Sequence, residues 1–178
     1  MEKGYIHVYT GNGKGKTTAA FGLAVRALCA GKSVYVGQFV KSMKYNETRI
    51  EQLFANADDS FGKITIEQLG RGCFIDKEPE QTDIDTAREA LAHCKAIMEE
   101  GKFDVVILDE LCIALHFHLL TEEEVLSALR ERAENMEVVI TGRKAPQSLV
   151  DIADLVTDMQ EVKHYYTQGI LSRNGIDH

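Results

Sequence analysis

The sequence predicts an α/β protein of three layers, in which a mostly parallel sheet of five or six strands lies between helices. Short apolar segments rich in β-branched residues alternate along the chain with segments whose apolar residues recur at helical spacing. The first apolar segment passes through a glycine-rich turn straight into a helical pattern. Alternating strands and helices form parallel sheets through right-handed crossovers, so these observations favour this class. We expect residues 1–178 to form one domain, as the length allows.

Each element is predicted by its own pattern. The expected strands are residues 5–9, 33–40, 64–69, 103–110, 137–141 and 155–162. The expected helices are residues 17–30, 49–54 and 82–99, and two more that begin after Thr121 and Pro146. Gly31 and Gly101 are natural stops for the two long helices, while Thr121 and Glu124 form a capping box. No regular form is predicted for residues 163–178.

The glycine-rich turn after the first strand reads TGNGKGKTT and has the features of a phosphate-binding P-loop. Gly11, Gly13 and Gly15 leave backbone N–H groups open to phosphate oxygens, and the N-terminus of the next helix adds partial positive charge. Lys16 is expected to reach the terminal phosphates and Thr17 to hold Mg²⁺. The turn departs from the usual G-x-x-x-x-G-K-[ST] pattern only at the first glycine position.

The whole turn is expected to contact nucleotide. Its residues are Thr10, Gly11, Asn12, Gly13, Lys14, Gly15, Lys16, Thr17 and Thr18. The alternative is a glycine-rich turn without a ligand. A strand before the turn and a helix after it make the nucleotide site the favoured interpretation.

The fourth expected strand is apolar and ends in two acids, Asp109 and Glu110. Such a strand is typical of the second half of a P-loop site, so Asp109 is expected near Mg²⁺, directly or through water. Glu110 is expected to polarise water, or to contact the metal or the ribose. We therefore assign catalysis to Lys16, Thr17 and Glu110, and the metal to Thr17, Asp109 and Glu110.

Two cations follow the ends of other strands. Lys41 follows the second strand and Arg143 follows the fifth. Because ligands bind outside the carboxyl ends of strands in open α/β sheets, both are expected to contact the phosphates of ATP. A contact with a partner subunit is the alternative for Arg143. A solvated loop is an equal alternative for the charged segment at Lys41.

Composition excludes several classes. A net charge of −8 argues against nucleic acid or an anionic membrane as a partner. We find no apolar segment long enough for a membrane span and no signal segment, so we expect a cytoplasmic protein. The four cysteines form no C-x-x-C pair and are expected to be reduced and mostly buried. His116 and His118 are expected to pack or face solvent rather than bind metal.

Several stretches resemble the P-loop type of ATP:corrinoid adenosyltransferases. They are residues 8–22, with threonine at the first glycine position, QFVK at 38–41, VVILDEL at 105–111, VITGR at 139–143, VKH at 162–164 and GID at 175–177. The resemblance covers nearly the whole chain in the same order. It implies a RecA-like P-loop nucleotide-binding fold.

The resemblance also implies the reaction. Co(I) of a reduced corrinoid, cob(I)alamin or cobyrinic acid a,c-diamide, attacks the 5′-carbon of ATP. The adenosyl group moves to cobalt and triphosphate leaves as one unit, in adenosylcobalamin biosynthesis or salvage. The family's ATP lies reversed in its P-loop. A homodimer and an electron-donating reductase are implied as partners.

Two departures from the family pattern stand out. Many members carry a segment before the first strand that helps to cover the site, whereas here the first strand is expected from about Tyr5. Many also have a tryptophan near the corrin, and this sequence has none. Phe74 is then the best candidate for displacing the lower axial ligand of cobalt.

Three other functions share the P-loop. A small P-loop kinase should show a lid rich in arginines. A RecA-like ATPase would use Asp109 and Glu110 for hydrolysis, and a nucleotide sensor would bind ATP without turnover. Release of triphosphate separates the transferase from all three.

Overall fold

The fold is seen in a computed structural model, which describes residues 2–41, 43–72 and 78–178. Its strands are β1 Ile6–Thr10, β2 Val34–Gln38, β3 Ile64–Gln68, β4 Val105–Asp109, β5 Glu137–Thr141 and β6 Leu155–Asp158. Its helices are α1 Lys16–Cys29, α2 Ile50–Ala55, α3 Gln81–Glu100, α4 Leu111–His116, α5 Glu122–Arg130 and α6 Gln147–Ile152. Two 3₁₀ turns are η1 Asn46–Arg49 and η2 Tyr165–Gln168.

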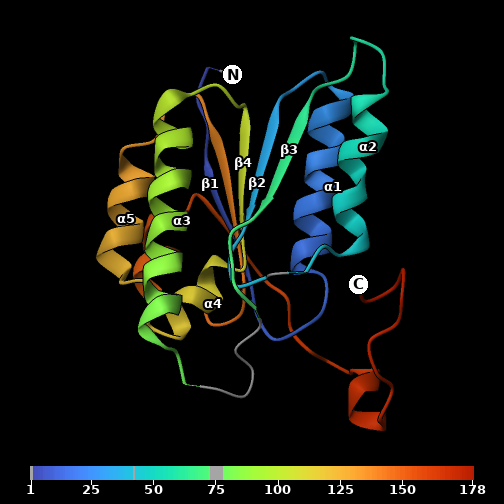
Figure 1. Cartoon of the computed structure of the whole chain (residues 1–178), viewed down its shortest axis with the longest axis vertical. Helices are drawn as coiled ribbons and strands as arrows, with labels where there is room; N and C mark the ends of the chain where they lie inside the picture. The colour runs from blue at the N-terminus through green and yellow to red at the C-terminus, as the bar shows by residue number, and fades with distance from the viewer. Residues whose placement is uncertain (1, 42, 73–77) are drawn as a thin grey trace.

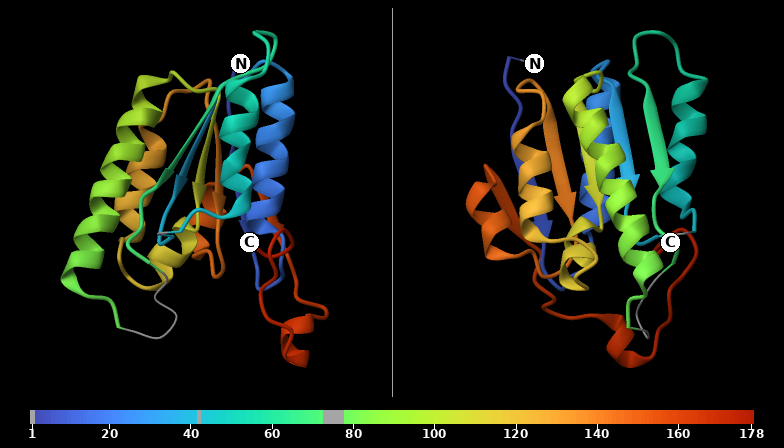
Figure 2. Two further views of the ribbon diagram at one scale, coloured as in Figure 1. Left: turned by 45° about the vertical axis from the view of Figure 1, so that its right-hand side comes forward. Right: turned by 60° about the vertical axis from the view of Figure 1, so that its left-hand side comes forward.

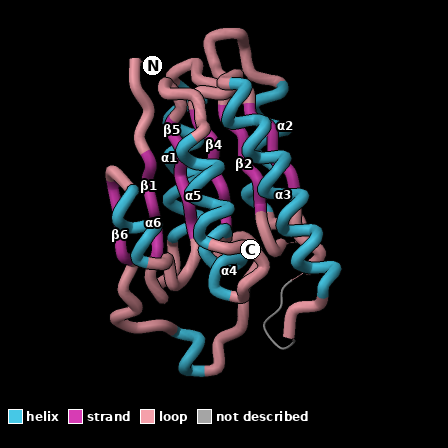
Figure 3. The backbone as a smooth tube through the Cα atoms, turned by 90° about the vertical axis from the view of Figure 1, so that its left-hand side faces the viewer, coloured by secondary structure: helices cyan, strands magenta, loops and turns pink. Residues whose placement is uncertain are grey.

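The strands form one six-stranded sheet in the order β3-β2-β4-β5-β1-β6, and every neighbouring pair is parallel. Helices α1 and α2 cover one face of the sheet and α3, α4, α5 and α6 the other (Figures 1 and 3). The predicted α/β class with a five- or six-stranded sheet is confirmed. The arrangement is consistent with a RecA-like P-loop fold.

Burial follows the position of each strand in the sheet. Every residue of β2 and β4 is buried, as expected for central parallel strands that read as continuous apolar runs. By contrast, β6 lies at the sheet edge and all four of its residues are exposed. In α1 the apolar residues that recur at helical spacing are buried against the sheet: Ala20, Phe21, Ala24, Ala27 and Leu28.

Two helix boundaries form as the sequence predicts. The Glu124 backbone N–H donates to Thr121 Oγ1 at 3.2 Å, and the Thr121 backbone N–H donates to Glu124 Oε2 at 2.7 Å. Gly101 ends α3 with φ of 65°. Both outcomes confirm that local capping chemistry sets these ends.

Three element predictions are wrong. The second strand ends at Gln38 rather than residue 40, because Val40 has φ of 64°, a left-handed conformation that no strand contains. The last strand ends at Asp158, where the chain turns to pack on the glycine-rich turn. Helix α4 was not predicted. Glu110, with φ of 62°, turns the chain from β4 into α4 in a single residue, so no loop separates the strand from the helix.

The carboxyl ends of the strands all lie at one end of the sheet, the lower end in Figures 1 and 2. The chain after β6 leaves the sheet there and runs below these ends towards α1, as the red trace in Figure 2 shows. In the parts of the chain that the structure describes, no helix has both the length and the apolar character that crossing a membrane requires.

Candidate active site

A cleft of about 970 Å³ lies at the carboxyl ends of the strands. Its lining includes residues 13–18 of the glycine-rich turn and α1, Val40 and Lys41 after β2, residues 45–47, Glu110 with Ile113 and His116 of α4, Arg143, and several residues between His164 and His178. Cavities of roughly 300–1,000 Å³ are typical of small-molecule sites, so this cleft can take a nucleotide together with part of a larger substrate.

Lys16 begins α1 and is buried, with 8% of its surface exposed. Its Nζ donates to the carbonyl oxygens of Gly11 at 2.8 Å and Gly13 at 2.6 Å, and so holds the turn in its curled form. Burial lowers the pKa of Lys16, and the nearby Glu110 carboxylate opposes that shift. Gly15 precedes the helix with φ of 118°, a conformation that favours glycine.

Two glycines of the turn also pack against the chain at the end of β6, a contact that the sequence did not reveal. Gly13 donates its backbone N–H to the Met159 carbonyl at 2.7 Å. A Cβ on Gly13 would lie 2.6 Å from that carbonyl oxygen, and one on Gly11 would collide with Asp158 and Met159. Glycine is therefore required at both positions by the chain that follows β6, in addition to any phosphate.

We expect Gly13→Ala to lower the free energy of unfolding by about 1–3 kcal/mol, because the added methyl group must displace the backbone at Met159. Gly22→Ala is the matched control. Gly22 lies in α1 with no atom within 4 Å of an added Cβ, so this change should raise stability by about 0.5–1 kcal/mol. Urea unfolding of both variants measures the two effects. Equal effects of the two substitutions would contradict this packing role of Gly13.

Thr10, at the usual first glycine position, also has a structural role. Its Oγ1 accepts a hydrogen bond from the Ala145 backbone N–H at 3.2 Å. This contact ties the end of β1 to the loop after β5, which carries Arg143. Arg143 lines the cleft there.

Asp109 is the centre of a buried polar network, with none of its surface exposed. Its Oδ1 accepts from Thr17 Oγ1 at 2.8 Å and from Thr141 Oγ1 at 2.7 Å. Its Oδ2 accepts from Gln38 Nε2 at 3.0 Å and from Lys41 Nζ at 2.7 Å. Burial alone would raise the pKa of Asp109, but Lys41 and these hydrogen bonds hold it below its usual range. The carboxylate is therefore ionised, and both of its oxygens are occupied.

The structure brings most of the residues predicted from the sequence together at the cleft, but two of the predicted nucleotide contacts, Lys14 and Lys41, pair with acidic side chains there. Lys41 pairs with Asp109, and its Nζ lies 5.3 Å from the centre of the Tyr45 ring. The burial of Lys41 favours its neutral form, but the Asp109 carboxylate outweighs this and raises its pKa. Lys41 thus neutralises Asp109 at the back of the cleft. The sequence analysis did not identify Thr141, or the contact of Gln38 with Asp109. Both are polar residues at the end of a buried strand, and this is the signal that could have indicated a role at the site.

Glu110 lines the cleft directly. Burial, and then repulsion from the adjacent Asp109, raise its pKa above the usual range, although Lys41, Lys16 and Arg143 lower it. Its backbone N–H donates to Thr141 Oγ1 at 3.0 Å, which fixes the left-handed turn into α4. This geometry aims the side chain at the cleft from the same strand end as Asp109.

The structure also places His116 and three of the four cysteines. His116 and Phe117 contribute to the wall of the cleft. Cys94 and Cys112 are buried free thiols and Cys29 is an exposed one. Cys73 and Phe74, the residue proposed from the resemblance to contact the corrin, lie outside the described residues.

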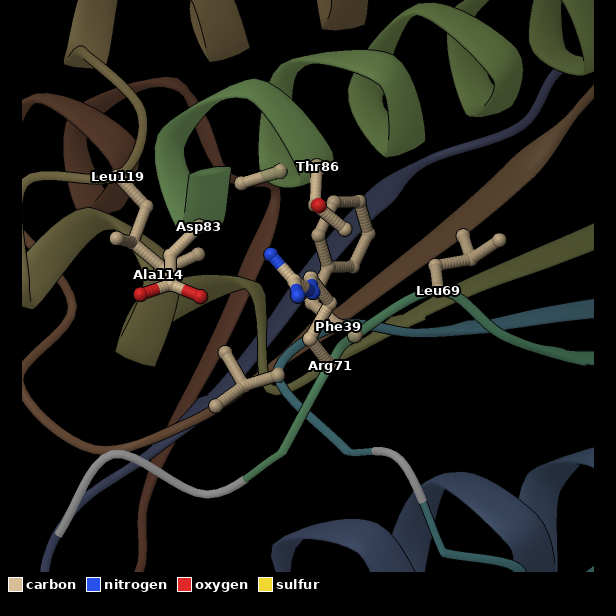
Figure 4. Close-up of a pocket in the computed structure, with 10 residues that line it drawn as sticks. Phe39, Leu69, Arg71, Asp83, Thr86, Ala114 and Leu119 are labelled. Atoms are coloured by element: carbon tan, nitrogen blue, oxygen red, sulfur yellow. The ribbon is translucent and has the colours of Figure 1, made fainter. Parts of the chain in front are cut away.

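A second hollow, of about 10 Å³, lies between α3 and the sheet. Arg71, Asp83 and Thr86 line it together with Phe39 and Leu69, and Figure 4 shows these side chains, which come from the ends of β2 and β3 and from the start of α3. This volume suits roughly one water molecule, so the large cleft is the better candidate for the active site.

Comparison with known proteins gives a consistent result. The family model described as "ATP:corrinoid adenosyltransferase BtuR/CobO/CobP" matches residues 2–178. The corrinoid adenosyltransferase of Escherichia coli (strain K12) is 38% identical over 177 residues, which cover 99% of this chain and 87% of that protein.

Two further relatives agree. "Corrinoid adenosyltransferase CobA" of Salmonella typhimurium is 37% identical, with 99% of this chain and 87% of the relative covered. The corrinoid adenosyltransferase of a Sinorhizobium species is 35% identical over 179 residues, with 99% and 81% covered. Since the matched residues include the glycine-rich turn, the acidic end of β4 and the rest of the cleft, this chain belongs to the ATP:corrinoid adenosyltransferase family.

Proposed function

We propose that this protein transfers the 5′-deoxyadenosyl group of ATP to the cobalt of a reduced corrinoid and releases triphosphate. The observation that carries the proposal is the match to the family over residues 2–178. The cleft supports it, because one cavity of about 970 Å³ joins the phosphate-binding turn to a wall with several aromatic side chains. The same residues in a RecA-like ATPase or a small P-loop kinase would leave that wall without a role.

The chemistry asks for little acid or base catalysis. The Co(I) electron pair forms the bond to the 5′-carbon while the bond from that carbon to the triphosphate oxygen breaks, and the pair from that bond leaves with triphosphate. The protein must stabilise a polyanionic leaving group and align the two reactants. The backbone N–H groups of residues 14–18, the N-terminus of α1 and the Lys16 ammonium would provide the stabilisation.

The residues of the cleft fit a Mg²⁺ ion. Thr17 donates its hydroxyl hydrogen to Asp109, which leaves the oxygen lone pairs of Thr17 available to a cation. The Glu110 carboxylate lines the same cleft. Thr17 and Glu110 would therefore hold the ion, and Asp109 would orient Thr17 rather than bind metal itself. A bound Mg²⁺ would neutralise part of the triphosphate charge.

Further features of the proposal rest on the family resemblance. We propose that residues 1–178 act as one domain, that the protein is a cytoplasmic homodimer, and that a reductase supplies the electron that generates Co(I). The net charge of −8 supports the absence of nucleic acid from the reaction.

The decisive assay mixes the protein with MgATP and chemically reduced cob(I)alamin without oxygen and follows the absorption spectrum of the corrinoid. We expect conversion to a light-sensitive alkylcobalamin that depends on both ATP and protein. Phosphate release without any change of the corrinoid would instead assign an ATPase. Binding of ATP without either product would assign a nucleotide sensor.

A further inference from the structure

The chain after β6 forms a large part of the cleft wall. We call residues 161–178 the C-terminal strap. Nine of its residues line the cleft: His164, Tyr165, Tyr166, Ile170, Ser172, Gly175, Ile176, Asp177 and His178. Apart from the turn η2 the strap contains no helix or strand, and its path below the sheet is visible in Figure 2. Something other than regular secondary structure must therefore hold it in place.

One carboxylate organises the strap from within. Asp177 accepts hydrogen bonds from the Tyr165 hydroxyl and from the Arg173 backbone N–H at 3.0 Å, and Arg173 Nε lies 3.2 Å from the same carboxylate. The Arg173 guanidinium also stacks on the Tyr165 ring at 4.5 Å. The hydrogen bond from Tyr165, followed by that from Lys14, holds the pKa of Asp177 well below its usual range. The carboxylate is therefore charged under ordinary conditions.

The same carboxylate also joins the strap to the glycine-rich turn. Lys14 Nζ lies 2.9 Å from Asp177 Oδ1 and donates to the Ile176 carbonyl at 2.9 Å. A second tie is made at η1, where Asn46 Nδ2 donates to Asn174 Oδ1 at 2.6 Å and to the His178 carbonyl at 2.8 Å. The strap thus spans the cleft from the turn to η1. Lys14, predicted from the sequence as a nucleotide contact, is engaged with the strap.

We propose that Asp177 is a positioning residue that clamps the C-terminal strap to the P-loop through Lys14 and so completes the nucleotide wall of the cleft. The inference rests on the proposed function, because it names how that same site is closed. Asp177 itself need not touch ATP. The strap would then cover part of this site.

The test compares Asp177→Ala, Lys14→Met and the double variant with the wild type. Each single change removes a charge-assisted contact, so we expect about a tenfold rise in KM for ATP with kcat within about twofold. The double variant should be no worse than Asp177→Ala alone, because both single changes break the same contact between Lys14 and Asp177. Asp59→Asn, an exposed aspartate in the loop after α2, is the matched control and should leave both constants unchanged.

A second readout does not depend on activity. Arg173 is a trypsin site within the strap, and we expect both Asp177→Ala and Lys14→Met to speed cleavage after Arg173, while Asp59→Asn leaves it slow. The effect of Asp177→Ala should be the larger one, because this change also removes the contacts of the carboxylate with Tyr165 and Arg173. Additive effects of the two substitutions on KM would overturn the proposal, as would a rise in KM for Lys14→Met without a rise for Asp177→Ala. Unchanged cleavage in Asp177→Ala would overturn it too. Since cleavage and equilibrium ATP binding need no corrinoid, a wild type without transferase activity would contradict the proposed function separately.

Discussion

Lys16→Ala will lower kcat for adenosyl transfer by about 10²–10³, the usual loss when one preorganised charge or donor is removed from a developing anion. Lys16 is the buried cation of the glycine-rich turn and lines the cleft. Its loss also frees the carbonyls of Gly11 and Gly13, which Lys16 Nζ now holds within 2.8 Å. The turn would therefore lose both its charge and its shape. Single-turnover formation of the alkylcorrinoid measures the effect without interference from product release.

The control for this change is Lys63→Ala. Lys63 is exposed and lies on the loop before β3, away from the residues that line the cleft. It carries the same charge, so the comparison separates a local effect from a change in net charge. A Lys16→Ala variant that keeps more than about a third of the wild-type rate would show that the turn does not stabilise the leaving group.

Asp109→Ala will cost about 3–5 kcal/mol of stability, the range seen when one partner of a buried ion pair is removed. The loss has two physical causes. Lys41, whose side chain is only 15% exposed, would keep its charge without a counter-ion. The donors Thr17, Thr141 and Gln38 would also lose their acceptor. Urea unfolding monitored by circular dichroism gives the value.

A double-mutant cycle tests whether this cost belongs to the pair. Asp109→Ala combined with Lys41→Met should be less destabilising than the sum of the two single changes, because the second change removes the charge that the first leaves unpaired. Asp151→Asn is the control. Asp151 is exposed, and the hydrogen bond recorded for its side chain comes from Gln147, one turn away, so a change within about 0.5 kcal/mol is expected. Strict additivity would mean that Lys41 does not stabilise Asp109.

Local patterns in the sequence were enough to predict the fold class and the phosphate-binding turn. Helix spacing identified the buried face of α1, and capping chemistry identified the start of α5. Such signals lie within one element, where periodicity and single side chains decide the conformation. The boundary errors at Val40 and Asp158 arose because residues of strand-like composition continue past the last residue of the strand. Val40 has a left-handed backbone conformation, and the chain leaves the sheet after Asp158.

The contacts that organise the site could not be predicted in this way. Asp109 meets Thr17 and Thr141, which are 92 and 32 residues away in the chain, so no local pattern links them. The C-terminal strap has no periodicity, and its tie to Lys14 spans 162 residues. Both features come from strand order, which places β4 beside β2 and β5, and from the return of the chain across the carboxyl ends. The proposed role of Phe74 stays a prediction.

The most direct test of the central claim is ³¹P NMR of the products formed from MgATP and cob(I)alamin. We predict one triphosphate for each adenosylcorrinoid, because the turn around Lys16 holds the leaving group as a single polyanion. Pyrophosphate and phosphate accumulating from the start, in place of triphosphate, would contradict a transfer in which triphosphate leaves the enzyme as one unit.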